Sequence, residues 1–448
     1  MSNWALRCAV IFFICGITAQ ATVKLGNEVL VEKNFQPLAG KRVGLIINPS
    51  GINASFESTV EVLRHAPDVK LVALFAPEHG IYGDIPAGDK VTNRVDARTG
   101  LPVHSLYDKT RKPTQEMLRG LDALVFDVQD TGVRSYTFIS TMGLAMQACA
   151  EAGVEFVVLD RPNPLGGERV EGPMVEEKFR SFVSQFDIPY VYGMTCGELA
   201  QMINGERWMT NQCKLTVVPM HAWKRKMLWR DTGLPWIPTS PHVPEADSPM
   251  YMAATGIIGE LGSANIGVGY PAPFHCIGLP GMDMWKLSQT LNDYNLPGVK
   301  FKPLTYKPYY GPFTTNIISG AQIFILDPRR APLTPLNFYI IEAVEKVSGH
   351  DLFADAKKNF DEAQAAKARS TAEKAAKDKA EGKEPKKEEP SKTPAKPPTA
   401  FDMFDKVTGT DATRKALESG KSAAEIVNSW KSGEEKFRRE REKYLLYK

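Results

Sequence analysis

The sequence predicts an α/β fold, namely a Rossmann-like, doubly wound and mostly parallel sheet followed by a second, smaller C-terminal α/β domain. Short apolar runs alternate with stretches of helical periodicity, which is typical of successive βαβ units. Several of these runs stop abruptly at polar residues, as buried parallel strands do. The length points the same way, because 448 residues with 43% hydrophobic content can bury a large core and divide into two domains.

The elements of the N-terminal half follow in chain order. Strands are expected at 42–48, 70–76, 102–107, 122–128, 155–160 and 215–219. Helices are expected at 56–66, 114–120, 140–152 and 195–205. Gly153 favours a left-handed C-cap after the third helix, and Thr195 with Glu198 forms a capping box at the fourth. With right-handed crossovers, this order winds the chain over both faces of one sheet.

The composition shifts toward Gly, Pro and aromatic residues near Ser248, so we expect a catalytic domain at 22–247 and the smaller domain at 248–448. The second domain is expected to hold one strand and four helices, at 322–326, 336–348, 413–419, 423–431 and 434–447. Residues 362–399 form a low-complexity insertion that starts as an Ala/Lys/Glu run and continues as a Pro/Lys/Glu segment too polar to pack.

The first residues have the pattern of a secretory signal. Arg7 precedes an apolar run from Cys8 to Ile17, and Ala19-Gln-Ala21 is a small-x-small cleavage site. We therefore expect a signal peptide at 1–21 and a periplasmic or secreted mature protein. No apolar run reaches the roughly 20 residues that a spanning helix needs, so no membrane span is expected.

The net charge of +3 comes from the insertion. Residues 354–400 hold 12 Lys/Arg and 9 Asp/Glu, and the rest of the chain has 43 of each. A neutral body lacks the concentrated basic face that nucleic-acid binding requires, so no nucleic-acid partner is expected.

No cofactor is expected either. The chain has no G-x-G-x-x-G or G-x-x-x-x-G-K-[ST] phosphate motif after its strands and no G-x-S-x-G elbow. Apart from two cysteines in the signal peptide, the cysteines are scattered without C-x-x-C spacing, at 149, 196, 213 and 276. Buried free thiols are therefore expected rather than a zinc site or a disulfide framework.

Polar residues at the strand ends are the candidate site. Glu78 and His79 follow the strand at 70–76, where a carboxylate beside an imidazole can supply general acid or base catalysis; the alternative is a hydrogen-bonded turn. The next strand end and the loop after it carry Asp127, Gln129, Asp130, Arg134 and Tyr136, and the strand end after that carries Arg161 and Asn163. Because carboxyl ends of parallel strands share one edge of a sheet, we expect these groups to face one crevice.

The chemistry expected of this crevice is glycosidic. Asp127 and Asp130 form an acidic pair of the kind that can bind a metal ion. Arg134, four residues after Asp130, favours a neutralised, sugar-binding network instead, so no metal site is expected. Cleavage of glycosidic bonds normally uses two carboxyl groups. Glu168 or Glu171, in the Pro/Gly-rich loop at 161–173, is a candidate for the second, and the alternative is that both are solvent-exposed loop residues.

Linked motifs along the chain resemble those of the bacterial exo-β-N-acetylmuramidases of the NamZ type. The motifs are Ala76-Pro-Glu-His-Gly80, Phe126-Asp-Val-Gln-Asp-Thr-Gly-Val-Arg134 with Tyr136-Thr137, Leu159-Asp-Arg-Pro-Asn-Pro164, Val170-Glu-Gly-Pro173, Gly193-Met-Thr195, Gly197-Glu-Leu-Ala200 and Lys443-Tyr-Leu-Leu-Tyr447. The resemblance implies a Rossmann-like domain, a smaller C-terminal domain and release of N-acetylmuramic acid from non-reducing ends of peptidoglycan fragments.

The resemblance also implies roles for residues. Glu78 is the leading catalytic carboxylate and Glu171 the weaker second candidate, while Glu260 falls at the family's motif glutamate and is expected to bind substrate. Arg134 and Arg161 suit the lactyl carboxylate that distinguishes muramic acid from glucosamine. The chain departs from the family after Glu260, because the run Asn265-Ile-Gly-Val-Gly-Tyr270 has apolar residues where many members carry Glu and Arg.

Two other functions fit the same residues. A non-catalytic protein that binds wall sugars would use the same crevice without needing Glu78 for chemistry. A metal-dependent phosphoesterase would use Asp127, Asp130 and His79, and a chelator would abolish its activity.

Overall fold

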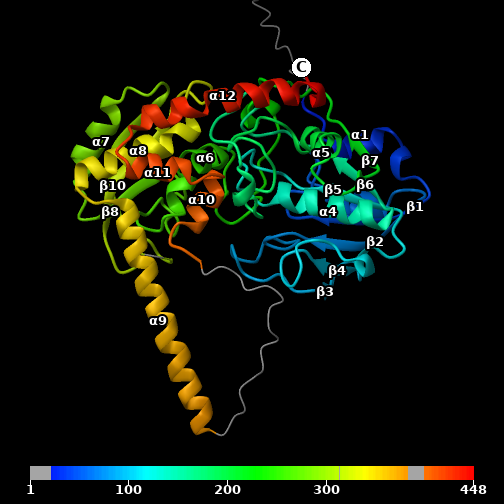
Figure 1. Ribbon diagram of the computed structural model, residues 1–448. Coiled ribbons are helices and arrows are strands. Elements are labelled where there is room, and N and C mark those ends of the chain that lie inside the picture. The colour runs from blue at the N-terminus through cyan, green and yellow to red at the C-terminus, as the bar shows by residue number, and fades with distance from the viewer. Residues whose placement is uncertain (1–21, 312, 382–397) are drawn as a thin grey trace, which may run out of the picture.

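The computed structural model describes residues 22–311, 313–381 and 398–448 and places two domains side by side (Figure 1). The expected signal peptide and most of the Pro/Lys/Glu-rich part of the insertion lie outside the described residues.

The first domain is built on a seven-stranded sheet with the order β3-β4-β2-β1-β5-β6-β7. Every neighbouring pair is parallel except β3 with β4. The strands are β1 (Lys41–Ile47), β2 (Val69–Ala76), β3 (Arg94–Val95), β4 (Pro102–Ser105), β5 (Ala123–Asp127), β6 (Glu155–Leu159) and β7 (Leu215–Val218). The predicted mostly parallel α/β sheet is confirmed, and β3 adds an antiparallel edge strand that the sequence did not indicate.

Helices cover both faces of this sheet. They are α1 (Gly26–Glu32), α2 (Thr59–Arg64), α3 (Gln115–Leu118), α4 (Phe138–Ala152) and α5 (Cys196–Gly205). Phe75, Phe126 and Phe156 on one face pack in a cluster with α4 and α5, and the alternate strand residues pack with α1 and α2. The α2 helix is shorter than expected, because Ser58 caps it through the Val60 amide.

The second domain has a three-stranded antiparallel sheet with the order β8-β10-β9. Its strands are β8 (Cys276–Pro280), β9 (Val299–Tyr306) and β10 (Ile318–Ile325). Its helices are α6 (Ser248–Gly259), α7 (Met284–Asp293), α8 (Leu333–Ser348), α9 (Leu352–Ala380), α10 (Asp402–Thr408), α11 (Ala412–Glu418) and α12 (Ala423–Arg441). The strand and helix expected at 322–326 and 336–348 are parts of β10 and α8, whereas β8, β9, α6 and α7 were not expected.

Two long helices leave the compact body of the second domain. The start of α9 is buried at Leu352, Phe353 and Ala356, but every side chain from 361 to 377 is exposed, and the helix projects away from the body (Figure 1). The α12 helix crosses from the second domain to the first (Figure 1). It replaces the two separate helices expected at 423–431 and 434–447, because the chain stays helical through Gly433.

The residues after α12 attach the end of the described chain to the first domain. The Tyr447 hydroxyl donates a hydrogen bond to Asp160 Oδ2 at 2.6 Å and accepts one from the Met220 amide at 3.0 Å. The Leu446 amide donates to Glu198 Oε1 at 2.8 Å. The two domains are therefore connected a second time, far from the crossing at residue 248.

Candidate active site

Glu78 stands two residues beyond β2 and is 8% exposed. One carboxylate oxygen accepts a hydrogen bond from the Thr137 hydroxyl at 2.6 Å, and the other accepts one from the Gly88 amide at 3.2 Å. Thr137 is the N-cap residue of α4, so Glu78 also lies near the positive end of a 15-residue helix. These contacts hold the carboxylate in one position and suit its negative charge.

His79 adopts a left-handed backbone conformation, with φ of 70°, which is uncommon for a residue other than glycine. Its Nδ1 lies 2.8 Å from the Ile85 carbonyl oxygen, so Nδ1 carries the proton. This contact fixes the imidazole beside Glu78 and leaves Nε2 without a hydrogen-bond partner among the described residues.

Glu78 and His79 line a cavity of about 500 Å³, here called the central cavity, whose walls come from both domains. This volume lies in the range of small-molecule sites. Besides Glu78 and His79, its polar lining residues are Tyr107, Arg111, Ser135, Tyr136, Thr137, Ser181, Ser240, His242, Glu260 and Lys406. A recess of about 260 Å³ adjoins it, shares Ser135 and Glu260 with it, and is otherwise lined mainly by glycines and apolar side chains, including Ile266 and Val268.

Glu260 enters the central cavity from the second domain, at the C-cap of α6. Burial raises the pKa of its carboxyl group to about 7. No described residue donates a hydrogen bond to this carboxyl group, so nothing offsets the loss of solvation. Burial therefore favours the protonated form of Glu260 up to about pH 7.

Tyr107 and Tyr136 complete the polar surroundings of Glu78. Burial raises the pKa of Tyr107 to about 12, and the nearby charge of Glu78 adds to the increase. Burial also raises the pKa of Tyr136. Both phenols stay protonated at neutral pH and can donate hydrogen bonds in the cavity, as was expected of Tyr136 alone.

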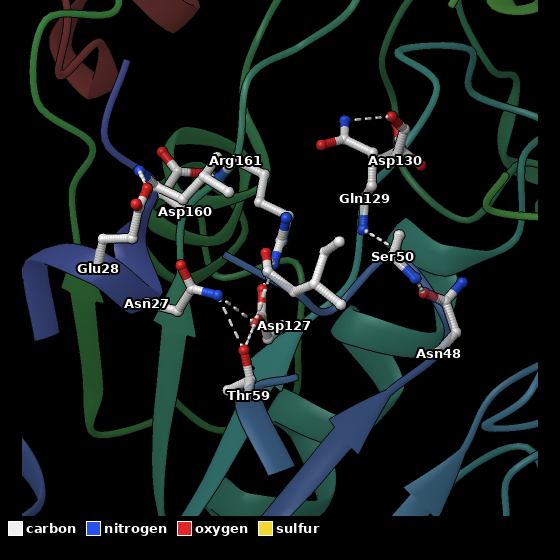
Figure 2. Close-up of polar contacts among 12 residues, drawn as sticks. Asn27, Glu28, Asn48, Ser50, Thr59, Asp127, Gln129, Asp130, Asp160 and Arg161 are labelled. Carbon is white, nitrogen blue, oxygen red and sulfur yellow. Dashed lines mark hydrogen bonds and ion pairs between the residues drawn. The ribbon is translucent and has the colours of Figure 1, made fainter. Parts of the chain in front are cut away.

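The structure contradicts the prediction that all the strand-end residues face a single crevice. Asp127 and Arg161 form a buried ion pair, with Arg161 Nη2 3.0 Å from Asp127 Oδ2, where the strand order reverses between β1 and β5 (Figure 2). Thr59 and Asn27 donate further hydrogen bonds to Asp127. Arg161 lines a small cavity of about 20 Å³, room for roughly a single water molecule, and Asp127 does not line it.

Three more expected substrate contacts are structural. The Gln129 side-chain amide donates to the carbonyls of Asp130 and Pro162, at 2.8 Å each. Asp130 accepts from the Tyr192 hydroxyl and the Gly132 amide, and burial raises its pKa to about 6. The Asn163 side chain donates to the Met194 carbonyl and accepts from the Leu165 amide, at 2.9 Å each. None of these side chains lines the central cavity.

Arg134 does not line the central cavity either, which contradicts its expected role. It is fully buried, and its guanidinium donates to the carbonyl oxygens of Pro173, Ile188 and Val407 at 2.7 Å each and to Ser184 Oγ at 3.0 Å. Val407 belongs to the second domain, so this arginine joins the two domains. Four of the five N–H donors of this buried guanidinium are therefore taken by protein acceptors, and the side chain does not line the central cavity.

Glu171, expected as the second catalytic carboxylate, is also placed elsewhere. It is ion-paired with Arg169 and accepts a hydrogen bond from the Thr334 amide at 2.8 Å. It lines a separate pocket, at another part of the domain junction. Glu260 therefore replaces it as the carboxyl group that shares a cavity with Glu78.

Some cavity residues were not singled out from the sequence, namely Tyr107, Arg111, Ser240, His242 and Lys406. They come from loops after β4 and β7 and from α10. Pro241 and Pro244 beside His242 marked a loop, but no periodic pattern indicated Arg111 or Lys406.

The described residues contain no group of three or more His, Cys, Asp or Glu side chains that could hold a metal ion. The four described cysteines are buried and free, as expected. None of the described helices is both long and apolar enough to cross a bilayer.

Comparison with known proteins agrees with this architecture. Residues 43–247 match the family described as exo-β-N-acetylmuramidase NamZ, N-terminal, and residues 250–447 match its C-terminal counterpart. The peptidoglycan β-N-acetylmuramidase NamZ of Bacillus subtilis (strain 168) is 39% identical over 425 residues, which cover 95% of this chain and 91% of that protein.

Two solved structures from Bacteroides fragilis NCTC 9343 are also similar, and both are DUF1343 family proteins. BF0371 is 44% identical with a TM-score of 0.82, and BF0379 is 28% identical with a TM-score of 0.71. Each comparison covers 95% of this chain and 99% of the solved chain. The chain belongs to the NamZ family of exo-β-N-acetylmuramidases.

Proposed function

We propose that this protein is an exo-acting glycoside hydrolase that releases N-acetylmuramic acid from the non-reducing ends of peptidoglycan fragments. The observation that supports the proposal most is that Glu78 and Glu260 line one cavity from different domains and in different surroundings. Glycosidases need a carboxylic acid and a carboxylate on either side of the bond they cleave. The matching family and the Bacillus subtilis relative are described as β-N-acetylmuramidases.

In the proposed reaction Glu260 is the acid. It donates its proton to the glycosidic oxygen while the bond from that oxygen to the anomeric carbon breaks. The Glu78 carboxylate faces the positive charge that develops at the anomeric carbon. Water supplies the new hydroxyl group, and its other proton returns to the carboxyl pair. His79 and the phenols of Tyr107 and Tyr136 are placed to bind sugar hydroxyls.

We also propose that the protein works in the periplasm or outside the cell. The apolar run from Cys8 to Ile17 and the small-x-small site at Ala19–Ala21 support a cleaved signal peptide. Peptidoglycan fragments are met in those compartments. Sequencing the N-terminus of protein recovered from the periplasm or medium tests this proposal, and an uncleaved N-terminus in the cytoplasmic fraction contradicts it.

The test of the activity uses a chromogenic N-acetylmuramide. The wild type should release the chromophore with and without a chelator, and Glu78→Gln and Glu260→Gln should each lose at least about a hundredfold in kcat. Glu116→Gln is the matched control, because Glu116 is exposed on α3 and lies outside the cavity.

The outcomes separate the alternatives. Loss of turnover with a chelator indicates metal-dependent chemistry. Binding of muramyl saccharides without turnover by the wild type indicates a sugar-binding protein. Wild-type rates in both glutamine variants contradict the assignment of the carboxyl pair.

A further inference from the structure

Two cationic side chains line the central cavity without a carboxylate partner among the described residues. Arg111 enters from the loop after β4, and Lys406 enters from α10 of the second domain. Their neighbours in sequence are paired, Lys112 with Glu151 and Asp405 with Arg414. Arg111 and Lys406 thus differ from these neighbours in having no carboxylate partner among the described residues.

Aromatic rings hold the Arg111 guanidinium in place. Its central carbon lies 4.2 Å from the ring centre of Phe182 and 5.1 Å from that of Tyr107. Stacking on rings restrains the guanidinium plane while its edge remains able to donate hydrogen bonds. Tyr107 also lies near Glu78, so Arg111 is positioned close to the proposed reaction centre.

Lys406 is positioned by the buried arginine described above. Arg134 Nη2 donates to the carbonyl of Val407, the residue that follows Lys406, at 2.7 Å. This bond holds α10 against the first domain and sets the position of Lys406 at the cavity wall. Arg134 thus acts on the cavity through Lys406 and makes no contact with a ligand.

We propose that Arg111 and Lys406 together bind the lactyl carboxylate of the muramic acid residue and so select muramyl over glucosaminyl sugars. This inference rests on the proposed function. It moves the recognition of the carboxylate from Arg134 and Arg161, whose donors bind protein acceptors, to the two cations that face the cavity. A guanidinium binds a carboxylate through two parallel hydrogen bonds, and an ammonium adds a point charge from the other side.

The test compares kcat/KM for chromogenic N-acetylmuramide and N-acetylglucosaminide in Arg111→Gln, Lys406→Gln and the double variant. Each single change should lower the muramide-to-glucosaminide ratio by about tenfold or more, since a charged hydrogen bond made only by the muramide is lost. The glucosaminide rate should stay near that of the wild type. Lys109→Gln is the matched control, because Lys109 is exposed two residues from Arg111 and outside the cavity.

A binding measurement keeps this inference separate from the proposed activity. Titration of Glu78→Gln with N-acetylmuramic acid and with N-acetylglucosamine measures recognition without turnover. If the wild type has no muramidase activity but binding of N-acetylmuramic acid depends on Arg111 and Lys406, the proposed function fails and the inference holds. If the wild type turns over the muramide, and the double variant changes neither the muramide-to-glucosaminide ratio nor the binding of N-acetylmuramic acid, the inference is overturned and the proposed function stands. An equal loss of kcat/KM on both sugars also overturns the inference, because residues with a purely structural role would affect both sugars equally.

Discussion

Glu260 is a carboxylic acid at the end of a helix, where no described side chain donates a hydrogen bond to it. Glu78 has the same chemical group but accepts hydrogen bonds from Thr137 and Gly88 near a helix N-terminus. The two carboxyl groups therefore differ in their surroundings and not in residue type. The sequence could place Glu78 at a strand end, but it could not assign Glu260 to the opposite wall, because that depends on how the domains pack.

The pH dependence of turnover follows from Glu260. Its pKa is raised to about 7, so the proton that it donates is present below this pH and lost above it. We expect kcat to fall about tenfold per pH unit on the alkaline side of about pH 7 for a muramide with a poor leaving group. A substrate whose leaving group needs no protonation should show a much weaker fall. The pH profiles of kcat for both substrates check this, and equal profiles would exclude Glu260 as the acid.

At the scale of elements, the strand ends were predicted well and their shared crevice was not. The runs that stop at Glu78, Asp127 and Asp160 are β2, β5 and β6. The ion pair of Asp127 with Arg161 fills the point where the strand order reverses, which is the usual place for a ligand in such sheets. The central cavity lies instead near the end of β2. Helix periodicity and strand patterning do not reveal that an ion pair occupies the usual ligand position.

The α9 helix is an element with little structural connection to the rest. Its side chains from 361 to 377 are exposed, and only its first turns are packed. Replacing residues 362–399 by a Gly/Ser linker of about ten residues should leave kcat/KM within about twofold and the free energy of unfolding within about 1 kcal/mol. Steady-state kinetics and urea unfolding of the deletion variant measure both. Loss of muramidase activity with unchanged stability would show that the insertion takes part in binding substrate.

At the scale of the whole molecule, buried cations and the end of the described chain hold the domains together. Arg134 donates to Pro173 and Ile188 in the first domain and to Val407 in the second. From the sequence, an arginine beside acidic strand-end residues resembled a ligand-binding group. Its burial at a domain junction came from contacts between residues 273 positions apart, which no local pattern contains.

Arg134→Met should therefore lower stability. The change leaves three buried carbonyl oxygens without a donor, so we expect a loss of about 3–5 kcal/mol in the free energy of unfolding. Urea unfolding followed by tryptophan fluorescence measures it, with Lys109→Met as the exposed control. A variant of unchanged stability that accepts glucosaminides as well as muramides would restore Arg134 as a ligand-binding residue.

The attachment of Tyr447 to the first domain bears on how the chain matures. Its hydroxyl bonds Asp160 and the amide of Met220, which was synthesised 227 residues earlier. A nascent chain that has just left the ribosome through β7 therefore still lacks the ring that covers Trp223 and the phenol that satisfies a buried aspartate. The first domain stays unfinished while the second is being translated, and an incomplete domain of this kind is open to chaperones.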